Sequence, residues 1–189
     1  MGPLARLCST NPGKLRELRA ALPVWRIELL GAGADEYPPE EGETYYENAR
    51  RKALFGRGHA EPDAWVLGED SGLEVDGLDG LPGVRSARFG GDDPVTRLLD
   101  ALRGIDGEAR RARYMCELVA LAPDGSELRG TGTLEGRIGV EPRGNEGFGY
   151  DPIFVPDGME RTVAELGNDW KRTHSHRARA AAALAARTV

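Results

Sequence analysis

One stretch constrains this chain more than any other: Gly68-Glu69-Asp70-Ser71-Gly72-Leu73-Glu74-Val75, which follows the apolar run Trp65-Val66-Leu67. The apolar run predicts a buried strand, and we expect that strand to end where Glu69 and Asp70 begin. Acids at the end of a strand lie at the edge of an α/β sheet where ligands bind, and their oxygens suit Mg2+. A solvated acidic turn is the alternative interpretation, because two acids beside a glycine are common in loops.

Composition limits the class of protein. The chain has 189 residues, 40% hydrophobic and 30% charged, which suits a globular protein with one sizeable core or two small lobes sharing one. A net charge of -6 argues against a nucleic-acid surface, which needs a basic face. No apolar run has the length of a membrane span, and Met1 to Thr10 lacks the features of a signal peptide. We therefore expect a cytoplasmic protein that binds neither membrane nor nucleic acid, with Cys8 and Cys116 as buried free thiols.

The N-terminal segment has the layout of a phosphate site. A weak strand from Leu4 to Cys8 precedes Ser9-Thr10-Asn11-Pro12-Gly13-Lys14, and apolar residues at helical spacing follow. The free backbone N–H groups and the dipole at such a helix start favour an anion, and Lys14 adds a mobile charge. Ser9 or Asn11 suits a plain helix cap equally well, and the loop lacks the pattern of a Walker A motif.

A second helix is predicted to begin after Thr44, which forms a capping box with Glu47, and to reach about His59. Thr44, Asn48 and Lys52 recur at every fourth position, so they share one polar face of this helix. That face is either solvated or directed, with the acids that precede it, into a cleft.

The C-terminal half contains two further segments whose residues suit ligand binding. Arg143 to Pro152 places three glycines around Phe148 and Tyr150; glycine lets a ligand approach the backbone, and an aromatic ring can stack on a base. A Gly-rich turn with one of the two rings in the core is the alternative. Lys171 to Arg177 gathers basic side chains that suit either a solvated helix start or a site for an anion or carbonyl.

The remaining pattern predicts ordinary elements. They are a strand from Val24 to Leu30, a short helix from Asp93 to Leu102, a hairpin of Ala112 to Ala122 with Glu127 to Val140, a short apolar piece from Val163 to Leu166, and a final helix from Ala178 to about Arg187.

Taken in order, these segments resemble the RdgB/HAM1 family of inosine and xanthosine triphosphate pyrophosphatases. The matching blocks are Ser9 to Lys14; Glu43 to Ala49 with Lys52 and Ala53; Glu69 to Leu73; Gly147 to Pro152; and Lys171 with Ser175 to Arg177. Each block alone is weak, whereas their common order along most of the chain makes chance agreement implausible.

The resemblance implies an α/β fold, an elongated mixed β-sheet flanked by helices, with two lobes and a central active-site cleft. It implies one domain over residues 1–189, a homodimer, and Mg2+-dependent hydrolysis of ITP, dITP, XTP or dXTP to the monophosphate and pyrophosphate, which cleanses the nucleotide pool. Two alternatives stay open: a nucleotide-binding protein without catalysis, and a pyrophosphatase for another modified class of triphosphate.

The resemblance also implies roles for single residues. Asp70 is the candidate general base and, with Glu40 or its neighbour Glu41, a ligand of Mg2+. Asp70 and Arg177 are expected at opposite ends of the cleft, where Phe148 stacks on the base, and Lys171, His176 and Arg177 donate to its 6-oxo group. The full set expected to bind substrate is Ser9, Thr10, Asn11, Lys14, Lys52, Ser71, Phe148, Gly149, Tyr150, Asp151, Lys171, His176 and Arg177.

Overall fold

The computed structural model describes residues 2–187, except for the side chain of Ala34. The helices and strands are β1 (Leu4–Leu7), α1 (Pro12–Ala21), β2 (Arg26–Leu29), η1 (Ala34–Glu36), α2 (Tyr45–Arg57), β3 (Trp65–Val75), η2 (Asp76–Leu78), β4 (Pro82–Gly83), α3 (Pro94–Ala101), η3 (Gly107–Arg110), β5 (Arg111–Leu121), β6 (Glu127–Ile138), β7 (Phe154–Pro156), α4 (Val163–His174) and α5 (His176–Ala185).

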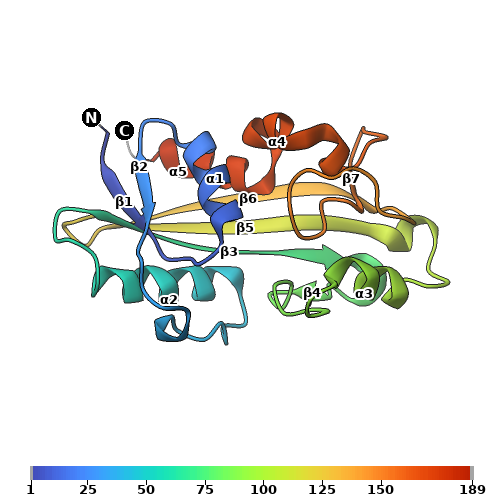
Figure 1. The fold of residues 1–189 in the computed structure, drawn as a ribbon, viewed down its shortest axis with the longest axis horizontal. Helices are drawn as coiled ribbons and strands as arrows, with labels where there is room; N and C mark the ends of the chain where they lie inside the picture. Colours follow the sequence, from blue (N-terminus) through green and yellow to red (C-terminus); the bar gives the residue numbers. More distant parts are fainter. Residues whose placement is uncertain (1, 188–189) are drawn as a thin grey trace. The chain divides into compact units, whose positions relative to one another are not determined.

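Across the described residues, seven strands form one sheet in the order β2-β1-β3-β5-β6-β7, with β4 paired to β3 off this path. β1 is parallel to β2 and β3, whereas β4 and β7 are antiparallel to their partners. Parallel neighbours need crossover connections, and α1 and α2 supply them (Figure 1). The predicted mixed sheet with flanking helices is confirmed.

The chain forms two compact units. Unit 1 contains the residues up to Asp70, Cys116–Gly132 and those from His176 onward, and unit 2 contains Ser71–Met115 and Thr133–Ser175. β3, β5 and β6 each continue from one unit into the other. Each unit is therefore assembled from segments that are distant in the sequence.

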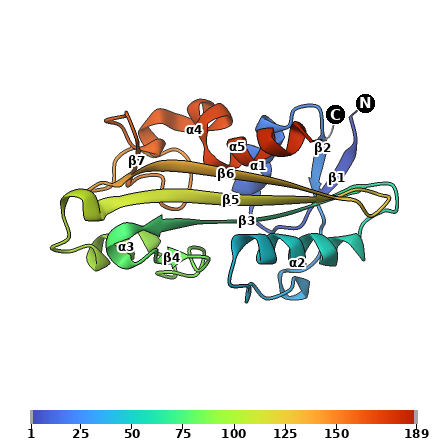
Figure 2. The same ribbon diagram turned by 180° about the vertical axis from the view of Figure 1, so that it is seen from behind.

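In unit 1, α1 and α5 pack together on one face of the strands, and α2 covers the other face (Figures 1 and 2). Leu67 of β3 belongs to the core on the α1 and α5 side, whereas the preceding Val66 packs with Ala49 and Ala53 of α2. This alternation is the two-residue period of a strand, and it fixes the direction of every later side chain of β3 within the unit.

Glycines let the helices of unit 1 lie directly on the strands. A Cβ atom at Gly68 of β3 would lie 2.0 Å from the carbonyl oxygen of Ala49 in α2. A Cβ atom at Gly132 of β6 would lie 2.0 Å from the carbonyl oxygen of His176 in α5. Since no side chain fits either gap, both positions require glycine for close approach.

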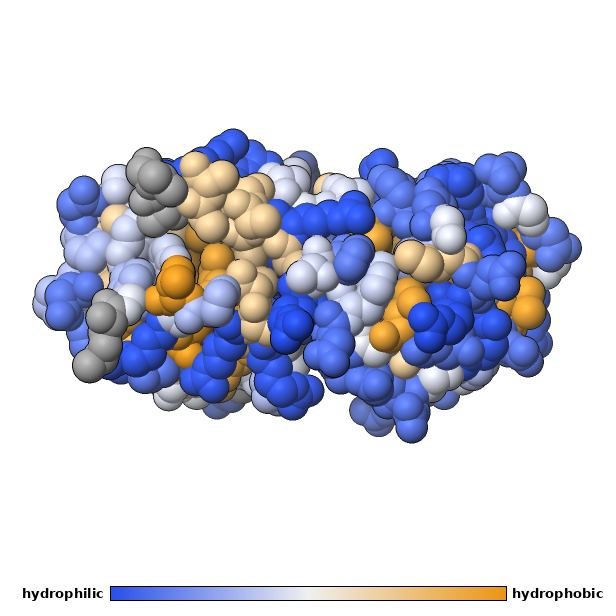
Figure 3. Space-filling model, turned by 90° about the horizontal axis from the view of Figure 1, so that it is seen from above, coloured by the Kyte–Doolittle hydropathy of each residue, from blue (hydrophilic) through white to orange (hydrophobic). Residues whose placement is uncertain are grey.

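The outer surface of α1 and α5 is weakly apolar. Figure 3 shows a pale-orange area over these helices. The alanines there that are partly or fully exposed include Ala20, Ala21, Ala182, Ala183, Ala185 and Ala186. Small side chains allow the close packing of α5 on β6 but contribute little apolar area per residue to the surface.

Unit 2 has its own core, formed by the ends of the long strands, α3, α4 and the Gly-rich loop before β7. Tyr150 is buried in it, and its hydroxyl donates to the carbonyl oxygen of Ser86 at 3.1 Å. Burial raises the pKa of Tyr150 to about 12. The buried members are Leu73, Val75, Leu98, Leu102, Ala112, Tyr114, Leu134, Ile138, Tyr150, Ile153, Phe154 and Val163.

Local signals predicted most elements correctly. Thr44 caps α2 in a capping box with Glu47, and Asp93 caps α3. The predicted hairpin is present as β5 and β6. Cys8 and Cys116 are buried free thiols, as expected, and burial raises the pKa of Cys8 to about 12. None of the helices in residues 2–187 combines the length and apolarity needed to cross a membrane.

One prediction of local structure was wrong, and another was incomplete. β3 does not end before Glu69 but runs to Val75, because β5 remains its neighbour and β4 pairs with it at Leu73. The short apolar piece Val163 to Leu166 is the first turn of a longer helix, α4. Thr162 and Glu165 form a capping box there, and their spacing is the sequence signal of this helix start.

Candidate functional site

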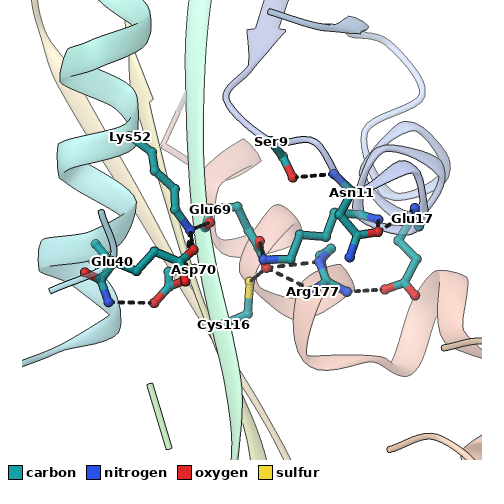
Figure 4. A network of polar contacts seen from close by, with 12 residues as sticks. Ser9, Asn11, Glu17, Glu40, Lys52, Glu69, Asp70, Cys116 and Arg177 are labelled. Atoms are coloured by element: carbon teal, nitrogen blue, oxygen red, sulfur yellow. Dashed lines mark hydrogen bonds and ion pairs between the residues drawn. The ribbon is translucent and has the colours of Figure 1, made fainter. Parts of the chain in front are cut away.

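Glu69 and Asp70 lie where β3 loses its parallel partner. β1 pairs with β3 only as far as Leu7 opposite Leu67, and the chain then leaves the sheet toward α1. The acids are therefore inside β3 yet just beyond the end of a parallel strand pair, which is the edge where α/β sheets bind ligands. Because alternate residues of a strand point to opposite faces, Glu69 faces α1 and α5, and Asp70 faces α2 (Figure 4).

The Glu69 face is a closed ion-pair network. Glu69 is fully buried. One carboxylate oxygen lies 2.6 Å from Lys14 Nζ, and the other accepts from Arg177 Nε at 3.1 Å and from an Arg177 terminal nitrogen at 2.9 Å. The remaining terminal nitrogen of Arg177 donates to Glu17 at 2.5 Å, and Cys116 Sγ donates to Glu69 at 3.5 Å.

The negative charge of Glu69 in this network is balanced by cations of the protein itself. Burial alone would raise the pKa of Glu69, but Arg177 and Lys14 outweigh burial and hold it well below its ordinary value. Burial opposes the charged form of Arg177 as well, and Glu69 and Glu17 raise its pKa above the ordinary value. Glu69 is therefore a stable anion inside the protein and a poor proton acceptor.

The Asp70 face is arranged differently. Asp70 is buried and accepts from Lys52 Nζ at 3.0 Å and from Asn48 Nδ2 at 3.1 Å. Lys52 also donates to the main-chain oxygen of Glu69 at 3.1 Å and contacts Glu40. Asn48 accepts in turn from the backbone N–H of Gly42 at 2.8 Å, which ties the loop before α2 to this face.

Burial raises the pKa of Asp70, against the opposing charges of Lys52 and Lys14. Burial also disfavours the charged form of Lys52, but Asp70 and Glu40 outweigh it and raise the pKa of Lys52. The two shifts look contradictory for one ion pair, since the first favours neutral Asp70 and the second favours charged Lys52. They agree once Glu40 is counted. The Lys52 ammonium is stabilised by two carboxylates, which raises its pKa, whereas Asp70 shares that single ammonium with Glu40 and gains too little to offset burial.

The phosphate-loop residues are organised around a helix cap. Asn11 Oδ1 accepts from the backbone N–H groups of Gly13 and Lys14, and Ser9 Oγ accepts from the N–H of Asn11. The helix-cap interpretation of Asn11 is thus confirmed. Thr10 is exposed and Ser9 is partly exposed.

Unit 2 holds a second buried ion pair. Lys171 of α4 donates to Asp151 Oδ2 at 2.5 Å, and the same oxygen accepts from the backbone N–H of Phe148 at 2.9 Å. Tyr114 donates to Asp151 Oδ1 at 3.3 Å. The ammonium of Lys171 lies 4.6 Å from the centre of the partly exposed Phe148 ring, a cation–π arrangement.

The core of unit 2 determines which of the two aromatic rings in this loop is buried. The expectation that one of them lies in the core is confirmed for Tyr150, so its ring is not available to stack on a ligand. Gly149 is exposed with a φ of 62°, and Ser71 follows Asp70 on β3, partly exposed.

The predicted basic cluster is divided between two helices. Lys171 belongs to α4 in unit 2, whereas His176 and Arg177 begin α5 in unit 1, and Arg172 is exposed. The expectation that Arg177 and Asp70 lie at opposite ends of a cleft is wrong. Arg177 binds Glu69, the residue next to Asp70, because α5 packs beside α1 on the same strands.

Several residues of these networks were not in the set expected to form the site. Glu69, Asn48 and Glu17 complete the contacts of Arg177 and Asp70. Asn48 lies four positions before Lys52 on the predicted polar face, which is a signal that could have identified it. Glu17 offers only its position one turn after Lys14, which is common on exposed helices.

Glu40 and Asp70 supply part of the ligand set of a metal ion. Within residues 2–187 no group of three or more His, Cys, Asp or Glu side chains is placed to hold a metal ion. Glu40 and Asp70 nevertheless converge on one cation, the Lys52 ammonium, and Glu41 is exposed. Two carboxylates with further oxygens from phosphate and water are the ligand set that suits Mg2+.

Comparison with known proteins identifies relatives that match almost the whole chain. The chain is 45% identical over 181 residues to a dITP/XTP pyrophosphatase of Deinococcus deserti, across 93% of this chain and 85% of the relative. It is 40% identical over 183 residues to a dITP/XTP pyrophosphatase of Bdellovibrio bacteriovorus, across 92% of each chain.

A HAM1 protein from Coxiella burnetii has a similar solved structure, with a TM-score of 0.83 and 32% identity over 98% of each chain. The sequence model of the Ham1 family matches residues 5–187. On the match to this model and the identity to these relatives, this chain belongs to the Ham1 family.

Proposed function

We propose that this protein is a nucleoside-triphosphate pyrophosphatase that hydrolyses the non-canonical purine nucleotides ITP, dITP, XTP and dXTP to the monophosphate and pyrophosphate. The names of its relatives indicate this substrate class. The observation that carries the chemistry is the buried Asp70, whose carboxylate is held by Lys52 and Asn48 with a raised pKa.

Asp70 acts as the general base in this proposal. Water attacks the α-phosphorus and transfers its proton to a carboxylate oxygen of Asp70. The bond from the α-phosphorus to the bridging oxygen breaks, and its electron pair leaves with pyrophosphate. A carboxylate with a raised pKa accepts this proton more readily than an ordinary aspartate, and Asn48 keeps it oriented.

The triphosphate needs positive charge and donors. We assign this task to Lys14, Lys52, Ser9, Thr10 and the backbone around Asn11. An anionic ligand would attract Lys14 and Lys52 away from their present carboxylate partners, which lie at hydrogen-bond distance.

We assign Mg2+ to Asp70 and Glu40. Glu40 is favoured over Glu41, because Glu40 shares the Lys52 ammonium with Asp70. When bound, Mg2+ neutralises negative charge on the phosphate oxygens. The two carboxylates would hold the ion, and Lys52 would then be available to phosphate.

Base recognition is assigned to Phe148 and Lys171, with the backbone of Gly149 and Tyr150. Phe148 offers a partly exposed ring for stacking, and Lys171 offers a donor to a 6-oxo group. Adenine carries an amino group there, which would face a donor. Asp151 holds Lys171 and the Phe148 backbone in place. Ser71 and His176 remain in the proposed substrate-binding set, and Arg177 is reassigned to support Glu69.

The proposal extends to the cellular context. We place the protein in the cytoplasm as one ITPase-like domain and as a homodimer, with a small nucleotide as its ligand. The four crossings of the chain between the two units support a single domain, since neither unit is a continuous segment.

The test is a panel of NTPs and dNTPs with Mg2+, in which pyrophosphate and orthophosphate are measured separately. We expect ITP, dITP and XTP to yield pyrophosphate well ahead of ATP. Orthophosphate as the primary product, or ATP as the best substrate, would contradict the proposal. Binding without turnover would instead identify a nucleotide sensor, and turnover of another modified triphosphate would identify a different substrate class.

A further inference from the structure

Helix α4 of unit 2 is two helical segments joined at Gly167. This glycine has a φ of 85° and a ψ of 175°, which is not helical. The first segment begins at Val163 behind the capping box of Thr162 and Glu165. The second segment begins at Asn168 and carries Lys171, the lysine assigned to base recognition.

The second segment has no cap of its own. The first N–H groups of a helix need acceptors, and the residue before the segment usually supplies one from a Ser, Thr, Asp or Asn side chain. Gly167 has no side chain, and its positive φ disfavours any residue that has one. The acceptor must therefore come from elsewhere in the chain.

Glu146 supplies it from the Gly-rich loop. One oxygen of its carboxylate accepts from the backbone N–H of Asn168 at 3.0 Å and from Asn168 Nδ2 at 2.8 Å. The other oxygen would lie 2.9 Å from a Cβ atom at Gly167, so the carboxylate fills the space a side chain would need. A negative charge at a helix start is also favoured by the helix dipole.

The loop and the second segment are thus joined twice. Glu146 binds Asn168 on the exposed side, and Asp151 binds Lys171 on the buried side. Phe148 lies between these attachment points in the sequence, and its N–H is held by the same Asp151 oxygen that binds Lys171. Losing the outer attachment would leave Asp151 to join the loop to the second segment, while the Tyr150 hydroxyl still holds the loop to Ser86.

We propose that Glu146 is a positioning residue that fixes Phe148 relative to Lys171 by capping the second segment of α4 from the loop. The inference rests on the proposed function for its effect on catalysis, and on the contacts alone for its effect on the loop. Glu146 touches neither of the two ligand-facing groups, so its removal should weaken substrate binding rather than the chemical step.

The kinetic test uses Glu146→Ala and Glu146→Gln with ITP. Losing a helix cap shifts the equilibrium between the ordered and the frayed helix start about fivefold. We therefore expect Glu146→Ala to raise KM about fivefold, with kcat within about twofold of wild type. Glu146→Gln retains an oxygen that can accept both hydrogen bonds and should restore KM to within about twofold of wild type. Equal KM values for Glu146→Ala and wild type would overturn the proposal, as would failure of Glu146→Gln to restore it.

Asn168→Pro separates positioning from helix stability. Proline is favoured at the first position of a helix but has no N–H, so this substitution breaks both contacts with Glu146 while helping the segment to start. We expect its KM to match that of Glu146→Ala, and the double variant to be no worse than either single one. A wild-type KM for Asn168→Pro would overturn the proposal, because Glu146 would then serve only the helix.

Hydrogen exchange measured by mass spectrometry makes the test independent of turnover. In Glu146→Ala and in Asn168→Pro, we expect faster exchange in peptides covering residues 144–151, with Glu146→Gln close to wild type. Unchanged exchange in that loop would overturn the proposal even if the enzyme hydrolyses ITP. If the wild type does not hydrolyse ITP, the proposed function fails, and the exchange result still decides the role of Glu146.

Discussion

Glu69 and Asp70 are neighbours in the sequence and are both buried, yet the two faces of β3 give them opposite electrostatic environments. Glu69 faces two cations, Arg177 and Lys14, and its pKa lies well below its ordinary value. Asp70 shares Lys52 with Glu40, and its pKa is raised. Pairs of acids whose pKa values are driven apart are a means of dividing roles. In our proposal, Glu69 accordingly organises the site and Asp70 performs the chemistry.

Removal of metal should have the largest effect, on the Asp70 face only. We expect a chelator to abolish hydrolysis of ITP, because the proposed ligands are oxygen atoms of Asp70 and Glu40, and MgCl2 to restore it. The thermal unfolding midpoint should change little, since the Glu69 network needs no metal. Full activity in metal-free buffer would mean that the Asp70 face needs no metal ion and does not differ from the Glu69 face in this respect.

Glu69→Gln should act on stability. The substitution removes the countercharge of the buried Arg177 and the partly buried Lys14, which costs about 3–5 kcal/mol in comparable buried pairs. Because the folded-state pKa of Glu69 is depressed, its stabilisation is present above the unfolded-state pKa of about 4.3 and is lost as pH falls through the folded-state value.

Urea unfolding of wild type and Glu69→Gln at neutral and acid pH measures this effect. The difference in unfolding free energy should be largest at neutral pH and should shrink in acid. An equal difference at both pH values would mean that the charge of Glu69 is not what stabilises the protein.

Arg177→Ala should resemble Glu69→Gln. It leaves Glu69 with one cation and removes a partner of Glu17, so we expect a loss of about 3–5 kcal/mol in unfolding free energy. Because its guanidinium serves this network, kcat/KM for ITP and ATP should fall by equal factors. Arg177→Lys, which keeps the charge but not the two parallel hydrogen bonds, should recover part of the stability. A selective fall for ITP at unchanged stability would show that Arg177 reads the base.

Asp70→Asn should act on the chemical step. It keeps the shape but removes the charge that accepts a proton, so kcat should fall roughly a hundredfold or more, while ITP binding measured by calorimetry survives in part. The unfolding free energy should change less than in Glu69→Gln, which serves as the matched control. Turnover of ITP near the wild-type rate would remove Asp70 from the centre of the site.

The pH dependence should show the smallest effect. The carboxylate form of Asp70 accepts the proton, so activity should be lost as pH falls through its raised pKa. The acid limb of kcat/KM for ITP should therefore lie above about 3.9, the ordinary aspartate value. Lys52→Met removes a charge that lowers this pKa and should move the limb to higher pH. An acid limb at or below the ordinary aspartate pKa would mean that cations lower the pKa of Asp70, as they do for Glu69.

The sequence by itself determined most of the local structure and the family. Capping residues such as Thr44 and Asp93 set helix starts through contacts only a few positions long, and the order of the motifs identified the relatives. The roles proposed for Asp70, Lys52 and Lys14 also came from the sequence, through the resemblance of their motifs to those of the family.

Only the tertiary structure decided which charges meet. Arg177 and Glu69 are 108 positions apart, and their contact depends on α5 packing beside α1, which no local pattern encodes. The opposite directions of Glu69 and Asp70 required β3 to continue past them, and that depends on its neighbours in the sheet. Hydrogen bonds within a few residues follow from the sequence, whereas ion pairs across the sheet follow from strand order and helix packing, which the whole chain determines together.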